Sequence, residues 1–371
     1  MKKSIISLSL VFVLLFLFIG SALSTENKSV PPADISPMDF SNYPIVTDED
    51  YYPDGYIGYV YPIRPGMIEW TEIISGTDMA RATQIPEDVL AKMSTDALLQ
   101  TVLAHPLMGD IYLVDSVEKG FEAMSSVFNG LDELLKRSEL TDCIMQAYNG
   151  VMETKQEALT LLKTLSATKS MNKSDISKYY GASRTVMRGS VAEDLLILQT
   201  NLSEAMISEI QRVSGRIYDI VYTPKGTSVL VYSDTPDMDD DLRDFIRNDV
   251  RIKFPLAVED GKPTIFYNCH SYAWFWSNKL NPYWMDNPEA YWFDGSYSSH
   301  TDKRNALVND KTVYRDNGSV KHSAIIKSIK VDGLHRIFTV QSKWGEGGLY
   351  THPELHCPPI YGTSIIAYKK N

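Results

Sequence analysis

The spacing of apolar residues changes near residue 216, and this change is the strongest constraint on the fold of the chain. Between about residues 86 and 215, apolar side chains recur every three or four positions, as in amphipathic helices. After residue 216, short runs rich in Val, Ile, Tyr and Phe alternate with turn residues, which is typical of β-strands. The sequence therefore predicts an α+β protein, with an antiparallel helical array at 86–215 and an α+β domain with an antiparallel sheet at 216–371.

The helical half contains several candidate helices. Ser94 begins the first of them, in a Ser-Thr-Asp sequence typical of an N-cap, and Pro106 ends it. The same apolar spacing recurs at residues 115–136, 139–149, 153–166 and 190–213. No repeat among these stretches is regular enough to indicate a solenoid. We interpret their Leu and Met stripes as hydrophobic core rather than as a cofactor site.

The second half opens with a predicted β-hairpin. Residues 217–222 and 228–232 are β-like runs on either side of a turn that contains Pro224 and Gly226. Two further antiparallel strands are expected around an Asp-Gly turn at residue 332, and a last strand is expected at 365–368.

An acidic run from Asp237 to Asp241 precedes apolar residues with helical spacing. It lacks the glycine and the terminal glutamate of an EF-hand loop. Acidic side chains are favourable in the first turn of a helix, so we interpret the run as a helix start, with a calcium site as the alternative.

The first 24 residues have the pattern of a secretory signal peptide. Lys2 and Lys3 precede an apolar run from Ile5 to Ile19, and Ala22 and Ser24 are small residues placed for cleavage after Ser24. The run is short for a membrane span, and an uncleaved membrane anchor is the alternative. We expect a secreted protein, extracellular or associated with the cell wall, that meets a membrane only through this peptide.

Composition limits the partners and the redox chemistry. The formal net charge of −11 argues against nucleic acid as a partner, because phosphate binding needs a basic surface. Residues 25–85 are predicted to be a flexible leader followed by an irregular segment.

The three cysteines, Cys143, Cys269 and Cys357, leave at least one thiol unpaired or in an intermolecular bond, and the sequence does not choose among the three pairings.

Cys269 is the candidate nucleophile. A short apolar run that starts at Thr264 ends at Asn268, and Cys269 then opens a segment with helical spacing. A cysteine in the first turn of a helix lies at the positive end of the helix dipole, which favours the thiolate. The alternative is that Cys269 is a small buried residue of the core.

A cysteine hydrolase also needs an imidazole and a polar group that orients it. His322 opens a predicted strand, and Gln341 or Ser342 on the next strand is the candidate orienting residue. The backbone N–H of Cys269 is a candidate oxyanion donor. His270, next to Cys269, is expected to pack or to cap the helix, because adjacent residues at a helix start point in different directions.

These residues resemble the papain-like NlpC/P60 and CHAP superfamily of bacterial cysteine peptidases and amidases, many of which cut peptidoglycan. Asn268-Cys269 stands in the place of the family's Asp-Cys, and the strand that begins at His322 resembles its His-Val-Gly-Ile-Val strand. Gln341 and Ser342 fall where the third polar residue of that family lies. The whole chain also resembles a group of secreted bacterial proteins with a helical N-terminal part. The resemblance implies a Cys–His hydrolase acting on a peptide or a peptidoglycan-like substrate.

Aromatic residues are concentrated between residues 264 and 297, and five of the six tryptophans follow residue 270. Such rings can line a groove for sugars or peptides, or they can form the core of a small domain. The candidate substrate-binding residues are Tyr267, Trp274, Trp292 and Trp344. The alternative function is a secreted module without catalytic activity that binds cell-wall polymer or protein in this groove.

The sequence indicates no metal ion or other cofactor. His352, His356 and Cys357 lie close together, but their spacing matches no zinc-binding pattern.

Overall fold

The structure is a computed structural model that describes residues 43–52, 55–140, 142–143, 216–332 and 335–371. The predicted signal peptide, the leader up to residue 42 and the predicted helices at 153–166 and 190–213 lie outside these residues. The predicted stretch 139–149 is described only as far as residue 143.

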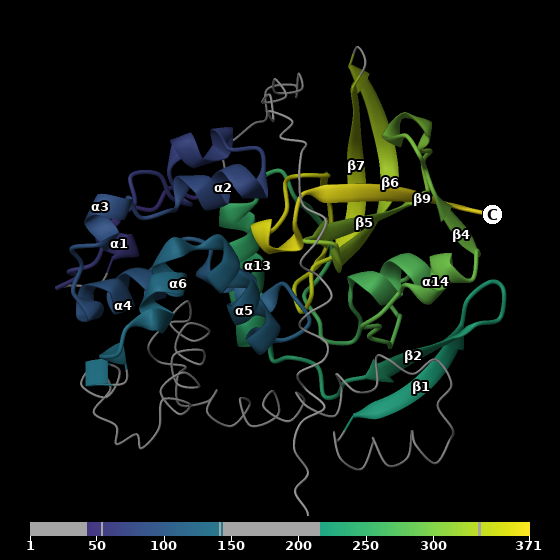
Figure 1. Cartoon of the computed structure of the whole chain (residues 1–371), viewed down its shortest axis with the longest axis horizontal. Helices are drawn as coiled ribbons and strands as arrows, with labels where there is room; N and C mark the ends of the chain where they lie inside the picture. The colour runs from purple at the N-terminus through teal and green to yellow at the C-terminus, as the bar shows by residue number, and fades with distance from the viewer. Residues whose placement is uncertain (1–42, 53–54, 141, 144–215, 333–334) are drawn as a thin grey trace, which may run out of the picture. The chain divides into compact units, whose positions relative to one another are not determined.

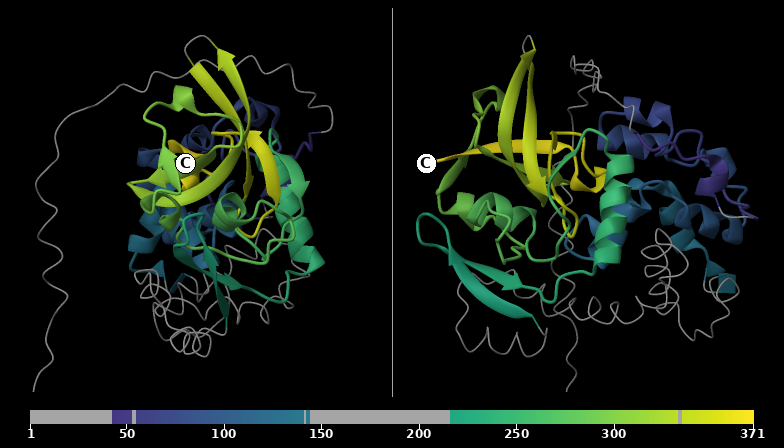
Figure 2. Two further views of the ribbon diagram at one scale, coloured as in Figure 1. Left: turned by 90° about the vertical axis from the view of Figure 1, so that its right-hand side faces the viewer. Right: turned by 180° about the vertical axis from the view of Figure 1, so that it is seen from behind.

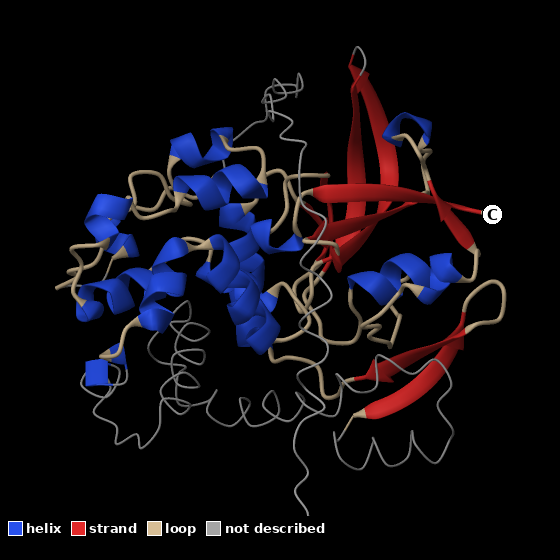
Figure 3. Ribbon diagram, in the orientation of Figure 1, coloured by secondary structure: helices blue, strands red, loops and turns tan. Residues whose placement is uncertain are grey.

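The described chain is α+β, with helices in the N-terminal half and antiparallel strands in the C-terminal half (Figure 1, Figure 3). The N-terminal helices and helical turns are α1 (Asp48–Tyr51), η1 (Ile68–Glu72), α2 (Gly76–Ala82), α3 (Glu87–Leu90), α4 (Thr95–Leu103), η2 (Met108–Tyr112), α5 (Val117–Val127) and α6 (Asn129–Lys136). The later ones are α13 (Asp240–Lys253), η3 (Ser271–Phe275), α14 (Ala290–Phe293), η4 (Lys303–Asn305) and η5 (Pro359–Tyr361). None of the helices in this part of the chain is long and apolar enough to cross a bilayer.

The strands form two sheets. The hairpin of β1 (Ile217–Tyr222) and β2 (Ser228–Ser233) is a sheet of its own. The larger sheet has seven strands in the order β3-β8-β7-β6-β5-β9-β4, and every neighbouring pair is antiparallel. Its strands are β3 (Val258–Gly261), β4 (Tyr297–Ser299), β5 (Lys311–Asp316), β6 (Ser319–Asp332), β7 (His335–Lys343), β8 (Leu349–Pro353) and β9 (Ser364–Lys370). The long β6–β7 hairpin extends beyond the other strands (Figure 2).

Several predicted elements are confirmed. The hairpin at 217–232, the strands on either side of residue 332 and the strand at 365–368 are present as β1–β2, β6–β7 and β9. Ser94 is the N-cap of α4, with its side chain accepting from the N–H of Ala97. Asp239 caps α13 in the same way, so the acidic run begins a helix as predicted.

The predicted helix at 115–136 is divided into α5 and α6. Phe128, between them, has extended backbone angles of φ −127° and ψ 112°. Its ring is buried and stacks on His105 with centroids 3.8 Å apart. The apolar spacing continues through this break because both helices bury the same side, so periodicity alone did not reveal it. Residues 46–85, predicted to be irregular, contain the helical segments α1, η1 and α2.

Two hydrophobic cores lie on the two sides of the large sheet. The first joins the N-terminal helices and α13 to side chains of the sheet such as Ile326, Val340 and Trp344. The second contains Val313 and Ile325, with the aromatic residues around η3 and α14 packed against them. Since neighbouring residues of a strand point to opposite faces, each central strand contributes to both cores.

A buried ion pair connects α13 to η2 inside the first core. The Nζ of Lys253 lies 2.6 Å from Asp110 and 2.5 Å from Asp249, and the side chains of Lys253 and Asp110 are 1% and 0% exposed. Burial opposes the charge of Lys253, yet the two carboxylates raise its pKa, so the ammonium stays charged. Trp70 donates its indole N–H to the carbonyl of Lys253 at 2.8 Å, which brings η1 to the same point.

We expect Lys253→Met to lower the free energy of unfolding by about 3–5 kcal/mol, because it leaves Asp110 buried without its cation. The double variant Lys253→Met/Asp110→Leu should recover most of this loss, since it removes the two fully buried charges and leaves only Asp249, whose side chain is 21% exposed. Urea unfolding measures both changes. Lys92→Met is the matched control, because Lys92 and its partner Asp88 are 77% and 75% exposed. An equal loss in the single and double variants would contradict the prediction.

Candidate active site

Cys269 opens the helical turn that continues as η3, as the sequence predicts. Asn268 caps this turn: its Oδ1 accepts the N–H of Ser271 at 3.0 Å, and its carbonyl accepts the N–H of Tyr272 at 3.0 Å. The side-chain amide of Asn268 donates to the carbonyl of Met285 at 3.0 Å and to Asp115 at 3.2 Å. An aspartate would cap the turn equally well but would lack these two donors.

The thiol of Cys269 is buried, with 4% of the residue exposed. Burial raises its pKa, and the charge of Asp115 raises it further. Three groups oppose this shift: the backbone N–H of Ser323, the backbone N–H of His270 and the ammonium of Lys343. The resting residue is therefore a neutral thiol, surrounded by donors and a cation that favour the thiolate.

His322 lies on β6, next to the residue whose N–H faces the thiol. Its ring is 0% exposed, stacks on Tyr361 with centroids 3.8 Å apart and planes at 2°, and meets Tyr314 edge-on at 5.3 Å. Within the described residues neither ring nitrogen has a hydrogen-bond partner, so no hydrogen bond joins His322 to Cys269. Burial, with the nearby His352 and His270, lowers the pKa of His322 well below its usual value.

Ser323 holds η3 against the sheet. Its hydroxyl accepts the indole N–H of Trp274 at 2.9 Å and lies 2.8 Å from the Nδ1 of His270. His270 therefore packs in the core, as its position beside Cys269 predicts. Because neighbouring strand residues point to opposite faces, the ring of His322 lies on the face of β6 away from Trp274.

The two candidate orienting residues bond to other partners. Gln341 accepts the hydroxyl of Tyr272 at 2.7 Å and donates to Asp260 at 2.7 Å. The hydroxyl of Ser342 lies 2.8 Å from the Nε2 of His352 and accepts the indole N–H of Trp344 at 2.9 Å. The orientation of His322 comes instead from its stacking on Tyr361.

Three of the four candidate substrate-binding residues lie in the hydrophobic cores. Tyr267, Trp274 and Trp344 are 1%, 4% and 0% exposed, so they do not line an open surface. Trp292 is half-buried and packs against Tyr368 at 5.0 Å. The sequence could not distinguish the two roles, since a groove and a core both favour large rings.

Lys343 is a site residue that the sequence analysis missed. It ends β7, is 0% exposed, and donates from Nζ to the carbonyl of Thr264 at 2.9 Å and to the carbonyl of Gly345. Burial lowers its pKa to about 7, although Glu346 and Cys269 act in the opposite direction. The position of Lys343 directly before Trp344, at the end of a β-like run, was the only sequence signal for this buried cation.

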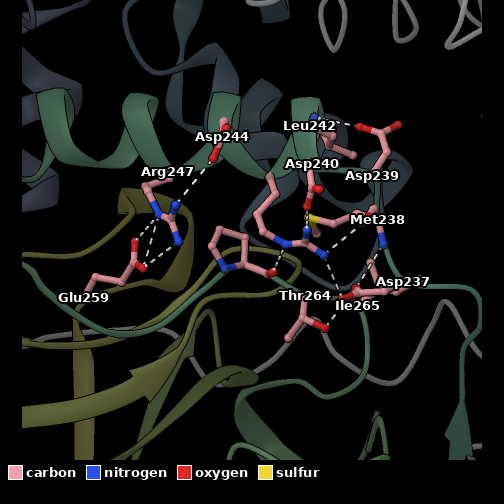
Figure 4. A network of polar contacts seen from close by, with 12 residues as sticks. Asp237, Met238, Asp239, Asp240, Leu242, Asp244, Arg247, Glu259, Thr264 and Ile265 are labelled. Atoms are coloured by element: carbon pink, nitrogen blue, oxygen red, sulfur yellow. Dashed lines mark hydrogen bonds and ion pairs between the residues drawn. The ribbon is translucent and has the colours of Figure 1, made fainter.

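Polar contacts from α13 hold the segment before Cys269 in place (Figure 4). The buried side chain of Arg243 donates to the carbonyl of Pro263 at 3.1 Å and to Asp237 at 2.9 Å. Asp237 in turn accepts the hydroxyl of Thr264 at 2.9 Å and the N–H of Ile265 at 3.0 Å. Arg243 also forms an ion pair with Asp240. Carboxylates of the acidic run therefore bind the guanidinium of Arg243 and a backbone N–H group.

The three cysteines are all free thiols, so none of the three possible pairings is formed. His352 and His356 are bonded to protein groups: His352 to Ser342 and the carbonyl of Pro353, and His356 to the N–H of Leu256. Over the part of the chain that the structure describes, no three His, Cys, Asp or Glu side chains are grouped as metal ligands.

Comparison of the chain with protein-family models, curated proteins and solved structures finds no match. The chemistry of the site therefore follows from its geometry. The thiol of Cys269 has two backbone donors and a cation nearby. The imidazole of His322 lies next to Ser323, one of these donors, and its nitrogens have no hydrogen-bond partner among the described residues. Nucleophilic acyl transfer uses components of these kinds.

Buried neutral histidines predict acid lability. Burial lowers the pKa of His270 and His352 to about 4 and that of His105 and His356 to about 3. These folded-state values lie below that of the unfolded chain, so their contribution to stability is complete above about pH 6.5 and is lost as pH falls toward 4 and 3. The raised pKa of Asp110, about 6, acts in the opposite direction and offsets part of the loss.

We expect the free energy of unfolding to decrease below pH 6.5 by about 1.4 kcal/mol per pH unit for each such histidine. His352→Gln should reduce this slope by one histidine's share, because glutamine keeps a hydrogen bond to Ser342 and does not titrate. Urea unfolding at a series of pH values measures the slope. An unchanged slope in this variant would show that His352 is not neutral in the folded protein.

Proposed function

We propose that the protein is a secreted, papain-like cysteine hydrolase that cleaves a peptide or amide bond, with a peptidoglycan-like peptide as the substrate class. The observation that supports this best is the imidazole of His322. It is fully buried, and among the residues that the structure describes neither nitrogen has a hydrogen-bond partner; it lies beside Ser323, whose N–H faces the thiol of Cys269. A buried polar group without partners is costly, and such groups occur where a function requires them.

In the proposed mechanism the thiol of Cys269 transfers its proton to His322 as its sulfur attacks the substrate carbonyl. The tetrahedral oxyanion is stabilised by backbone N–H groups at the start of the helical turn. His322 then gives the proton to the leaving amine, and a thioester remains on Cys269. Water, deprotonated by His322, hydrolyses the thioester, releases the acid product and restores the thiol.

The neutral forms of both residues are the starting state of these steps, and the pKa shifts of both residues oppose the proton transfer. Burial raises the pKa of Cys269 and lowers that of His322, so the ion pair does not form in the resting protein. The ammonium of Lys343 favours the thiolate electrostatically when the proton moves. Since Cys269 is 4% and His322 0% exposed, the substrate must displace neighbouring groups to reach the sulfur.

A binding module without catalytic activity is the second candidate, and one observation favours it. Aromatic rings next to the Cys269 turn are exposed while the turn itself is closed: Phe266 is 38%, Phe275 39% and Trp276 42% exposed. Exposed rings of this kind are typical of surfaces that bind sugars or peptides.

The two functions differ in their dependence on Cys269 and His322. We expect hydrolysis of purified peptidoglycan to be abolished by Cys269→Ala and to fall about 100-fold or more in His322→Phe. Phenylalanine keeps an aromatic ring that can stack on Tyr361 but has no nitrogen that can accept a proton. The assay is release of new amine groups. Thermal unfolding of each variant serves as the folding control. Binding of the polymer without release of amine, equal in wild type and Cys269→Ala, would favour the binding module.

We expect the pH profile of kcat/KM for hydrolysis to have an alkaline limb that depends on Lys343. Its pKa of about 7 means that its charge, present below pH 7, is lost as pH rises through this value. We expect kcat/KM to fall above pH 7 in the wild-type protein and to lose this fall in Lys343→Met, with a lower plateau. The acids that act on Lys343 include Glu346 and Asp237, so Glu346→Gln should move the limb to lower pH. The same alkaline limb in wild type and Lys343→Met would exclude this role.

A further inference from the structure

Three lysines on neighbouring strands of the large sheet form a cluster of like charge, here called the lysine cluster: Lys311 on β5, Lys327 on β6 and Lys370 on β9. The charges of Lys327 and Lys370 both act on Lys311. Among the described residues none of the three side chains forms an ion pair or a hydrogen bond. They therefore form a local cationic site on a chain whose formal net charge is −11.

The register explains how the cluster forms. Lys311 is paired with Ile325 on one side and with Tyr368 on the other, and Lys370 is two residues beyond Tyr368 on the same face. Lys327 is the extra residue of a β-bulge between Ile326 and Ser328. Bulges re-aim a side chain that a regular strand would place elsewhere.

The nearest acid does not neutralise the cluster. Asp310 precedes Lys311, but its carboxylate accepts from His300 at 2.7 Å and from the N–H of Leu307 at 2.8 Å. Burial and the two neighbouring lysines lower the pKa of Lys311 to about 8, against a smaller contribution from Asp310.

Edge protection is the ordinary structural role for lysines on a sheet, and it does not account for Lys311. Exposed lysines commonly protect the edge strands of sheets from pairing with other chains. In this sheet Lys311 is on an interior strand. Lys327 and Lys370 lie beyond the last pairings of β5, which are Lys311 with Ile325 and Lys311 with Tyr368, so these two lysines are in stretches paired on one side only. Like charges on neighbouring strands are destabilising, so the arrangement costs stability unless an anion offsets it.

We propose that the lysine cluster is a binding site for an oxyanion with more than one negative charge, either a molecule with several carboxylates or a phosphate group. The site is independent of the Cys269 chemistry, although it lies on the same face of the sheet. Val313, two residues from Lys311, is paired with Ser323, which holds the Cys269 turn.

Protection of Lys311 from acylation tests the proposal in the full-length protein. A small acylating reagent at pH 8 modifies neutral amines, and mass spectrometry gives the rate at each lysine. We expect citrate or inorganic phosphate to slow acylation of Lys311 at least three-fold relative to sodium chloride of equal ionic strength. Lys92, which is 77% exposed, is the internal reference and should be unaffected.

Variants separate the site from general screening. In Lys327→Gln/Lys370→Gln the protection of Lys311 should disappear, whereas Lys369→Gln should retain it, because Lys369 points to the opposite face of β9. Protection by citrate alone assigns a carboxylate ligand, and protection by phosphate alone assigns a phosphate ligand. Protection by neither anion, or protection that persists in the double variant, would overturn the proposal. These measurements require no hydrolytic activity, so they stand apart from the test of the proposed hydrolase.

Discussion

The alternation of side chains along β6 is the constraint on which the rest of the structure depends. β6 is the central strand of the seven, and its neighbouring residues face two different cores. Ser323 faces η3 and binds Trp274 and His270, while His322 faces Tyr314 and Tyr361. A shift of one residue in register would exchange these positions and destroy both sets of contacts. The same pleat therefore holds the Cys269 turn and sets the place of the imidazole.

Much of the architecture could be predicted from the sequence, because it follows from local patterns. The hairpin at 217–232, the β6–β7 pair and the cap of α13 were all visible as β-like runs, turn residues and acidic residues before a helix. Two of the strands that were missed, β3 and β4, are short and pair with segments far along the chain. β5 was missed although it pairs with β6 across the two-residue turn Asn317-Gly318, which is a local hairpin signal. β8 was also missed: it lies between β3 and β7, and no local sequence pattern indicates that position.

The candidate site was predictable only in part, for the same reason. The position of Cys269 at the start of a helical turn is a local property, and the structure agrees with it. The partners of Gln341 and Ser342 are not local: Tyr272 and Asp260 take the first, and His352 and Trp344 the second. The stacking of His322 on Tyr361 joins residues 39 positions apart, and nothing in the sequence around either indicates it.

The buried basic residues of this chain differ in the groups that their charges contact. Lys253 and Arg243 are buried beside carboxylates and connect elements, so their charges are offset where they lie. Lys343 is equally buried, yet its ammonium meets backbone carbonyls and the ring of Tyr267 instead of a carboxylate. Its charge therefore remains available to a nearby thiolate, because carbonyl dipoles solvate a cation without cancelling it. A protein that needed Lys343 only for packing would lose little by an apolar side chain there, since a buried charge without a counter-ion is costly to keep.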